Sequence, residues 1–316
     1  MTQVTDMDAY VLELARGARE AAARLRSLPG RRRDDALRRI ADDLEAQAAT
    51  IQKENARDLK AAEAAGLAAA MIDRLTLSEK RIAGMAESLR QIAMQVDPVG
   101  QIVEGSVRPD GLAVQRIRVP IGVVAFIYES RPNVTTDAAG LCLKSGNAIL
   151  LRGGKEAIHS NRALGRLIVA ALEATGLPAA AVQLIATTDR AAVAAMLKLD
   201  EQIDVVIARG GKGLIRAVVQ QATMPVLKHY EGICHVYVDA AADLQMAREI
   251  AVNAKCQRPG VCNAMETLLV HEAVAAELLP PLCRDLAAAG VELRGDEAVR
   301  GLVDGLKTAG EEDWKT

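Results

Sequence analysis

The chain has 316 residues, half of them apolar and a quarter charged, with a formal net charge of -2. A chain of this length buries a large core and commonly forms two domains. The small net charge gives no support for a nucleic-acid or anionic-membrane partner. Five scattered cysteines make neither a disulfide framework nor a zinc-binding pattern, so no metal is expected. Because residues 1–13 are too polar for a signal peptide and no apolar run is long enough to span a membrane, we expect a cytoplasmic protein.

The N-terminal part of the chain is predicted to be helical. Apolar residues recur at helical spacing between charged neighbours, at Leu37, Ile40, Leu44 and Ile51. Gly66 ends this pattern, and another helix is predicted over 78–95, before Asp97-Pro98. The basic run 31–33 is followed at once by two aspartates, which indicates a solvated helix start rather than a phosphate-binding arm.

A β-hairpin is predicted next. Residues 101–104 and 113–119 have strand-like patterns and flank the turn sequence Arg108-Pro109-Asp110-Gly111. Both faces of this hairpin are expected to be fairly polar, and an isolated hairpin is only marginally stable in water. We therefore expect it to pair with another polypeptide element.

From Gly122 onward, short apolar strands alternate with helices, which predicts a parallel sheet covered by helices on both faces. The expected strands are 123–127, 148–152, 182–186 and 203–208. The expected helices are 135–144, 160–175 and 190–199. A second α/β unit, with its boundary near 228–231, is expected to contain strands 236–238 and 267–270 and a helix over 244–254.

Two of the strands end in glycine-rich turns, Arg152-Gly153-Gly154-Lys155 and Arg209-Gly210-Gly211-Lys212-Gly213. Both turns are placed at the carboxyl edge of the predicted sheet, where parallel sheets bind their ligands. The glycines allow close backbone approach, and the N-termini of the helices that follow favour anions. The usual dinucleotide fingerprint is absent, and tight strand-to-helix turns without a ligand use the same glycines, so both interpretations stay open.

Cys262 lies in a segment that indicates a reactive cysteine. Pro259 and Gly260 interrupt regular structure, so the backbone bends just before Cys262, and an apolar strand follows. Free backbone N–H groups and the nearby Arg258 are typical surroundings of cysteine nucleophiles, whereas a small buried hydrophobe is the alternative. The other cysteines are poorer candidates, because Cys142 falls within an apolar helix, Cys234 enters a strand, Cys256 belongs to a helix end and Cys283 follows a helical run.

Three long motifs carry a family resemblance: residues 119–133, 144–157 and 257–263. Together they resemble the γ-glutamyl phosphate reductases, a family within the aldehyde dehydrogenase superfamily. The resemblance runs from about residue 31 to Thr316 and then stops abruptly, which implies a C-terminally truncated member. It implies an aldehyde-dehydrogenase-like α/β fold with an NADP-binding domain over 1–99 and 120–228, an oligomerisation hairpin over 100–119 and an incomplete catalytic domain over 229–316.

The resemblance also implies an activity, namely NADPH-dependent reduction of L-glutamyl 5-phosphate to L-glutamate 5-semialdehyde through a cysteine thioester, in proline biosynthesis. Implied partners are a small-molecule substrate, further copies of the chain in a homo-oligomer, and a glutamate 5-kinase as functional partner. One alternative is an NAD(P)-dependent aldehyde dehydrogenase that makes a carboxylic acid. Another is a non-catalytic cofactor-binding or assembly fragment.

Site residues follow from matching the family's motifs. Cys262 matches the nucleophile, and its backbone N–H together with the Asn133 amide would form the oxyanion hole. Asn133 could instead stabilise a turn after Pro132. Arg258 and Asn263 are implied in substrate binding, although Arg258 could equally form a surface ion pair.

Ordinary aldehyde dehydrogenases carry a glutamate that activates water to hydrolyse the thioester. No carboxylate matches it within 226–232, because Glu231 is three residues off, and this loss suits exchange of the thioester with phosphate. Of the four histidines, His229 and His235 are candidates for a proton shuttle, with a packing role as the alternative.

The first glycine-rich turn indicates the cofactor. Aldehyde dehydrogenases carry a lysine there for the adenine ribose, and often a glutamate three residues later. Here Arg152 takes the lysine's place and Lys155 the glutamate's, and a cation suits a 2'-phosphate. The implied cofactor is NADP(H), bound by Arg152, Gly153, Gly154 and Lys155, with Arg209, Gly210 and Gly211 near its pyrophosphate.

Overall fold

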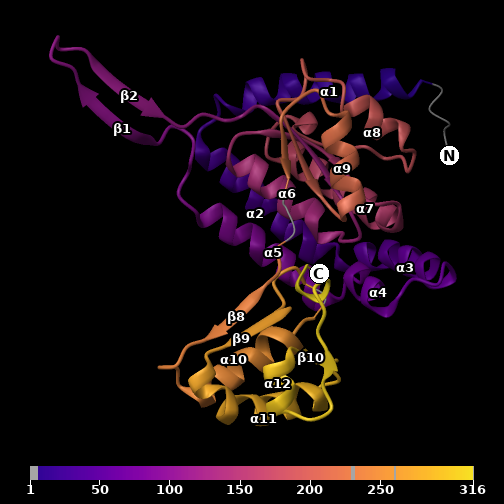
Figure 1. The fold of residues 1–316 in the computed structure, drawn as a ribbon. Helices are drawn as coiled ribbons and strands as arrows, with labels where there is room; N and C mark the ends of the chain where they lie inside the picture. Colours follow the sequence, from indigo (N-terminus) through magenta and orange to yellow (C-terminus); the bar gives the residue numbers. More distant parts are fainter. Residues whose placement is uncertain (1–5, 229–231, 260, 316) are drawn as a thin grey trace. The chain divides into compact units, whose positions relative to one another are not determined.

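The computed structural model describes residues 6–228, 232–259 and 261–315. The chain forms two compact units, Met1–His229 and Tyr230–Thr316 (Figure 1). The boundary expected near 228–231 falls largely on residues outside the described part, and it stays a prediction. Among the described residues, no helix combines the length and the apolar character needed to cross a membrane.

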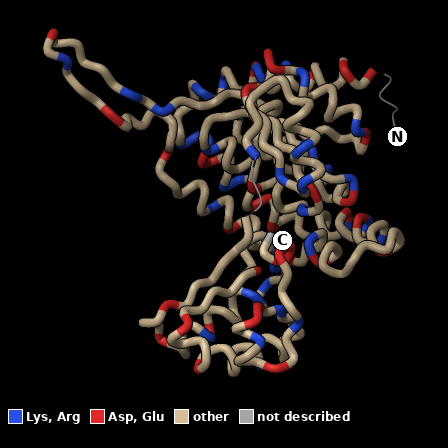
Figure 2. The backbone as a smooth tube through the Cα atoms, viewed as in Figure 1, with Lys and Arg blue, Asp and Glu red and all other residues tan. Residues whose placement is uncertain are grey.

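The first unit begins with helices, as the sequence predicts. They are α1 (Met7–Leu25), α2 (Gly30–Ala46), α3 (Ala48–Ala64), α4 (Ala69–Leu75) and α5 (Glu79–Met94). Gly66 follows α3 with a φ of 68°, a left-handed conformation that favours glycine at a helix end. The Ser78 side chain accepts a hydrogen bond from the Arg81 N–H at 3.3 Å and so caps α5 at the expected start. Lys and Arg are interspersed with Asp and Glu over the first unit (Figure 2).

Arg33 differs from the expected solvated helix start. Its side chain is 1% exposed, because its guanidinium reaches inward to the Asp97 carboxylate at 2.6 Å. Arg31 and Arg32 are exposed as expected. The basic run therefore contributes one partly buried ion pair that ties α2 to the segment after α5.

Strands β1 (Ile102–Val107) and β2 (Ala113–Ile117) form the predicted antiparallel hairpin. Gly111 supplies the turn with a φ of 87°. The hairpin projects away from the body of the first unit (Figure 1). The expectation of polar faces is wrong, because apolar side chains of the hairpin are exposed, including 72% of Val107 and 57% of Ile102.

A five-stranded sheet of described residues forms the core of the first unit, and all its pairs are parallel. In spatial order its strands are β5 (Val182–Leu184), β4 (Ala148–Arg152), β3 (Val123–Tyr128), β6 (Val205–Arg209) and β7 (Val226–Lys228). The connecting helices are α6 (Asn133–Lys144), η1 (Lys155–Ala157), α7 (Ile158–Ala174), η2 (Ala179–Ala181), α8 (Ala191–Met196) and α9 (Lys212–Gln221). Every residue of β4 is buried, as expected for a strand covered on both faces.

Strand β4 has the predicted bounds, whereas the other four strands of the sheet differ, and β3 ends one residue later than expected. Strand β5 ends two residues earlier than expected and β6 begins two residues later. Strand β7 was not predicted, because three residues are too few to show a periodic pattern. Strand pairing, rather than local pattern, sets these ends.

The second unit contains the two expected strands, β8 (His235–Val238) and β9 (Thr267–Val270), which pair in parallel and are joined through α10 (Leu244–Cys256). The elements after β9 are α11 (Glu272–Ala288), β10 (Arg294–Gly295), α12 (Glu297–Leu302), β11 (Lys307–Thr308) and η3 (Asp313–Lys315). Its apolar core joins Val238, Ala251 and Met265 to residues of α11. Cys283 lies inside α11, which corrects the expectation that it follows a helical run.

Candidate functional site

Three turns of the first unit lie at one edge of the parallel sheet. Ile127 is paired with Arg152, and Tyr128 is paired with Arg209. The turn after β3 therefore lies between the turn after β4 and the turn after β6. Since parallel strands present their carboxyl ends at one edge, the two predicted glycine-rich turns and Asn133 belong to one region.

Ser130, in the turn after β3, has an unusual backbone. Its φ of 49° makes it the one non-glycine residue of the described ranges with a left-handed conformation. Its backbone N–H and its hydroxyl both donate to Oε1 of Glu156, at 2.8 and 2.7 Å. Glu156 belongs to η1, directly after the Arg152–Lys155 turn, so one carboxylate joins two of the three turns.

Arg152 holds its own turn together. Its Nη1 donates to the Gly153 carbonyl at 2.6 Å and its Nη2 to the Thr188 carbonyl at 3.2 Å, while its buried Nε has no partner among the described atoms. Burial lowers the pKa of this guanidinium from its ordinary value. Lys155, in contrast, is exposed, and no hydrogen bond or ion pair found within the described ranges uses its ammonium. Lys155 is thus the cation of this turn that stays available to a ligand.

At three of the four predicted cofactor glycines, an added Cβ would come within 3 Å of a neighbouring side chain. A Cβ at Gly153 would lie 2.1 Å from Nδ2 of Asn161 and 3.0 Å from Cζ of Tyr128. At Gly154 it would lie 2.2 Å from Oε1 of Glu156, and at Gly210 it would lie 2.7 Å from Cδ of Glu129. Gly211 differs, because a Cβ there meets nothing within 4 Å. These distances support the interpretation that Gly153, Gly154 and Gly210 serve tight turns. At Gly211 the space beside the backbone is open.

A carboxylate already lies at the start of α9. Oε2 of Glu129 accepts a hydrogen bond from the Gly211 N–H at 3.0 Å, and Gly211 is the N-cap of that helix. Helix N-termini favour anions, so this contact shows that the turn after β6 presents a donor to negative charge.

Asn133 is engaged by a neighbour. Its Nδ2 donates to Oδ2 of Asp137 at 2.9 Å, one helical turn along α6. Burial raises the pKa of the Asp137 carboxyl, and this hydrogen bond and the charge of Arg209 oppose the rise. The amide thus stabilises the first turn of α6. Its role in an oxyanion hole stays a prediction.

Cys262 lies in the second unit, in the turn between α10 and β9, and its side chain is exposed. The thiol of Cys234 donates to the Cys262 carbonyl oxygen at 3.3 Å. Backbone bonds reinforce this contact, because the Cys234 carbonyl accepts the N–H groups of Glu266 and Thr267 at 2.9 and 3.1 Å. The Cys262 turn is therefore fastened to the start of β8.

The remaining cysteines are less accessible. Cys142 and Cys283 are buried, and burial raises the pKa of Cys142 to about 12 and also raises that of Cys283. Neither of these thiols supplies a thiolate near neutral pH. Cys256 ends α10, as expected from the sequence.

Arg258 and Asn263 flank Cys262, and both side chains are exposed. The Arg258 carbonyl accepts the Val261 N–H at 3.3 Å, whereas its guanidinium makes no hydrogen bond or ion pair in the ranges that the structure describes. The surface ion pair considered for Arg258 is thus not found there. His235 is exposed, with Nδ1 2.6 Å from the Ile233 carbonyl oxygen, and His229 lies outside the described residues.

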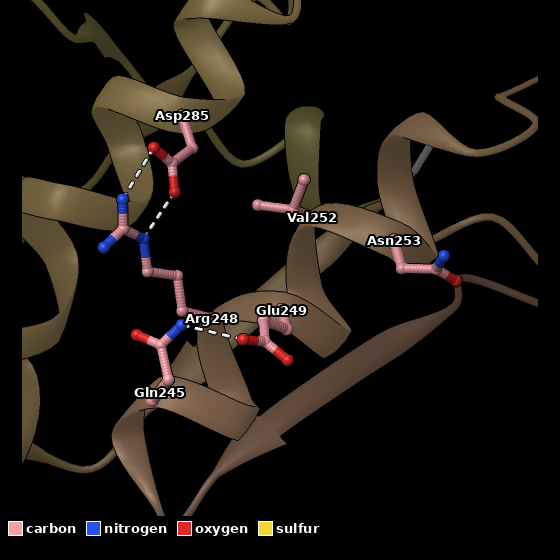
Figure 3. A pocket seen from close by; sticks show the side chains of 6 residues that line it. All are labelled: Gln245, Arg248, Glu249, Val252, Asn253 and Asp285. Carbon is pink, nitrogen blue, oxygen red and sulfur yellow. Dashed lines mark hydrogen bonds and ion pairs between the residues drawn. The ribbon is translucent and has the colours of Figure 1, made fainter.

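A shallow pocket of about 460 Å³ lies between α10 and α11 in the second unit (Figure 3). Its lining residues are Gln245, Arg248, Glu249, Val252, Asn253 and Asp285. Arg248 points at Asp285 and forms a two-point ion pair, with Nη2 2.7 Å from Oδ1. Because the lining contains neither a cysteine nor an uncompensated cation, we do not place the chemistry there. Across the described ranges, no group of three or more His, Cys, Asp or Glu is arranged to hold a metal ion.

Sequence reasoning missed three residues of the sheet edge. Glu129 and Ser130 fall within the motif 119–133, and Glu156 falls within the motif 144–157, but neither motif assigns them a role. The available signal was a carboxylate, Glu156, directly after a glycine-rich turn. Its partner Ser130 lies in the turn after the neighbouring strand β3, and this pairing is visible only in the structure.

Comparison with known proteins places the chain in a family. The model described as the aldehyde dehydrogenase family matches residues 2–300. A protein named gamma-glutamyl phosphate reductase from Desulfatibacillum aliphaticivorans is 53% identical over 304 residues, which cover 96% of this chain and 73% of that protein.

Two crystal structures of proteins with the same name are similar to this chain. The one from Thermotoga maritima is 45% identical, with a TM-score of 0.91 over 97% of this chain and 74% of that chain. The one from Saccharomyces cerevisiae is 32% identical, with a TM-score of 0.66 over 95% of this chain and 79% of that chain. The aldehyde-dehydrogenase-like α/β fold expected from the sequence is confirmed.

Proposed function

The chain belongs to the aldehyde dehydrogenase family, and from that membership we propose that it reduces L-glutamyl 5-phosphate to L-glutamate 5-semialdehyde with NADPH. The substrate is taken from three relatives named gamma-glutamyl phosphate reductase, whose sequences are 32% to 53% identical to this chain. The observation that carries the proposal is the exposed Cys262 on a turn fastened to β8. This is the placement that a cysteine nucleophile requires.

Cys262 performs the covalent step. Its thiolate attacks the acyl carbon of the glutamyl phosphate, a carbon–sulfur bond forms, and the carbon–oxygen bond to phosphate breaks with its electron pair leaving on phosphate. The result is a thioester on Cys262. When bound, the nicotinamide cofactor supplies the hydride that reduces this thioester. The tetrahedral adduct on Cys262 then expels the thiolate, which releases the semialdehyde and restores the nucleophile.

The first unit carries the residues that fit a nicotinamide dinucleotide phosphate. Lys155 is an exposed cation without a partner among the described residues, at the carboxyl edge of a parallel sheet. Gly211 offers open space at the start of α9, and its backbone N–H donates to the Glu129 carboxylate. Arg152 supports the turn through two carbonyls, so its contribution is to hold Lys155 in place. We assign the 2'-phosphate to Lys155 and the pyrophosphate to the region of Arg209, Gly210 and Gly211.

The segment that matches the water-activating glutamate of ordinary aldehyde dehydrogenases supports phosphate exchange over hydrolysis. Residues 226–228 form β7 and include no carboxylate, and Glu231 lies outside the described residues. A thioester without a matching base to activate water keeps its acyl group for reduction. We therefore favour the reductase over a dehydrogenase that makes a carboxylic acid.

The test runs the reaction backward. The 316-residue chain is given glutamate 5-semialdehyde and NADP⁺, with and without inorganic phosphate, and NADPH formation is followed at 340 nm, its usual absorbance band. We expect turnover that requires phosphate, that Cys262→Ala abolishes and that the control Cys256→Ala retains. Phosphate-independent formation of glutamate would contradict the proposal and favour hydrolysis. Retained turnover in Cys262→Ala would contradict the cysteine mechanism.

Three further expectations stay proposals. Arg258 and Asn263 are assigned to the substrate because both side chains are exposed beside Cys262. A homo-oligomer is proposed to form through the β1–β2 hairpin, whose exposed apolar side chains favour a partner surface. A functional partnership with a glutamate 5-kinase and a cytoplasmic location follow from the proposed reaction and from the composition alone.

A further inference from the structure

The strained residue at the sheet edge is Ser130. A left-handed φ of 49° disfavours any side chain, and Ser130 is nevertheless buried to 8% exposure in that conformation. Such residues persist only where their surroundings hold them, and they occur preferentially at functional sites. Contacts from the surrounding structure must therefore hold the turn after β3 in a backbone conformation that is unfavourable for serine.

Glu156 makes these contacts. Its Oε1 accepts from both the backbone N–H and the hydroxyl of Ser130, and hydrogen bonds to an ionised carboxylate are stronger than neutral ones. The contact is made possible from the other side as well. Gly154 leaves the space that the carboxylate occupies, because a Cβ there would lie 2.2 Å from Oε1. Glu156 thus reaches from the cofactor turn to the turn after β3.

The conformation of Ser130 determines where its neighbours lie. Glu129, directly before it, reaches the Gly211 N–H at the start of α9. Asn133, three residues after it, is the first residue of α6 and bonds to Asp137. A change in φ at Ser130 rotates Glu129 relative to Asn133, so that the Glu129 contact with Gly211 and the start of α6 cannot both keep their places.

We propose that Glu156 is a positioning residue of the reductase, which holds Ser130 in its left-handed conformation and thereby fixes Asn133 at the sheet edge. The expected effect of Glu156 on turnover rests on the proposed function. The expected effect of Glu156 on the conformation of Ser130 rests only on the two hydrogen bonds between them. Because Glu156 follows Lys155 in η1, it also links the cofactor turn to the turn that precedes Asn133.

Three variants test the catalytic consequence. Glu156→Ala removes both hydrogen bonds and is expected to lower kcat at least tenfold, with the Kd for NADPH changed less than twofold because Lys155 remains. Glu156→Gln keeps an acceptor oxygen for both donors and is expected to stay within threefold of wild type. In the Glu156→Ala background, Ser130→Gly is expected to recover at least threefold of the lost kcat, since glycine adopts a left-handed φ without penalty.

Glu173→Ala is the control, because Glu173 is an exposed glutamate on α7 and is expected to change neither kcat nor Kd. A Kd for NADPH that rises in step with the fall in kcat would overturn the proposal and leave Glu156 as a support of the cofactor turn only. Absence of any recovery in the double variant would overturn the role of backbone strain.

Amide hydrogen exchange tests the structural consequence without catalysis. The peptide over 129–134 is expected to exchange at least tenfold faster in Glu156→Ala than in wild type or Glu156→Gln, and to exchange at the wild-type rate in Glu173→Ala. Unchanged exchange in Glu156→Ala would overturn the proposal even if activity falls. Faster exchange in a protein that shows no reductase activity would support the positioning role and contradict the proposed function instead. Should Glu156→Ala not fold, Ser130→Ala removes the hydroxyl contact alone and takes its place in the exchange measurement.

Discussion

Adding one methyl group at Gly153 should destabilise the first unit. The new Cβ would lie 2.1 Å from Nδ2 of Asn161 and 3.0 Å from the ring of Tyr128. Both neighbours are 1% exposed and cannot move into solvent. They also share a buried network, because the Tyr128 hydroxyl lies 2.7 Å from Oγ1 of Thr135, which donates to Oδ1 of Asn161 at 3.1 Å. Room for the methyl therefore requires that this network open.

The size of the effect follows from two costs. Overpacking a well-packed region costs about 1–3 kcal/mol, and a buried polar group left unpaired costs about 1–3 kcal/mol. Because one displacement produces both costs, they do not add fully, and we expect about 2–4 kcal/mol for Gly153→Ala. A domain of this size shifts its Tm by about 2–4 °C per kcal/mol, so Tm should fall by about 4–16 °C.

Gly211→Ala is the matched control, since it makes the same chemical change in a neighbouring turn. A Cβ at Gly211 meets nothing within 4 Å, and its φ of -67° is open to alanine. We expect its free energy of unfolding to stay within about 1 kcal/mol of wild type. Urea unfolding followed by circular dichroism gives both values. Equal stability of the two variants would refute the argument that packing, rather than ligand contact, requires glycine at Gly153.

Three further predictions test the cofactor turn, the nucleophile turn and the second unit. Lys155→Glu should weaken NADPH binding more than tenfold in a fluorescence titration while leaving NADH within twofold, because a charge-assisted phosphate contact is lost at about 1.5–3 kcal/mol. Lys80→Glu, on an exposed site of α5, should change neither, and equal losses for both cofactors would place Lys155 outside the 2'-phosphate site. Cys234→Ala should lower kcat about two- to fivefold, because it removes a weak donor to the Cys262 carbonyl, whereas Cys234→Ser keeps a donor and should lose less. In the second unit, the hydrogen-bonded Arg248 lowers the pKa of the Asp285 carboxyl. The Arg248–Asp285 ion pair therefore stabilises the fold above the ordinary carboxyl pKa of about 4, and this stabilisation is lost as the pH falls through the pKa that Asp285 has in the folded protein. Tm should accordingly fall less steeply from pH 6 to about pH 3 in Asp285→Asn than in wild type, and parallel curves would show that the pair contributes nothing.

Local pattern was sufficient for elements whose burial is continuous. The run 148–152 is apolar throughout, and β4 has those bounds because a strand covered on both faces must be apolar at every position. The start of α5 was predictable as well, since Ser78 is a capping residue before a helical pattern. In both cases the residues that decide the structure are close in the sequence.

Contacts between distant segments could not be predicted in this way. Glu156 meets Ser130 across 26 positions of the chain, and Glu129 meets Gly211 across 82. Arg33 was expected in solvent because its neighbours are charged, yet its partner Asp97 lies 64 positions away. The sequence shows the charge of each side chain but not the charge of its distant partner in the fold. For this reason Glu156, Ser130 and Glu129 were not assigned a role, and Arg33 was expected to be exposed.

The cofactor prediction shows how geometry separates two meanings of one motif. Glycine in a strand-to-helix turn serves either a ligand or a neighbour, and the sequence does not distinguish them. In the structure, Gly153 and Gly210 face side chains of their own unit, whereas Gly211 faces open space and Lys155 faces no partner among the described residues. Arg209 is also exposed, and its guanidinium makes no hydrogen bond or ion pair within the described ranges. Of the seven predicted cofactor residues, Lys155, Arg209 and Gly211 are therefore the three whose side-chain positions no contact within the fold explains, and substitutions there should change cofactor affinity without a change in stability.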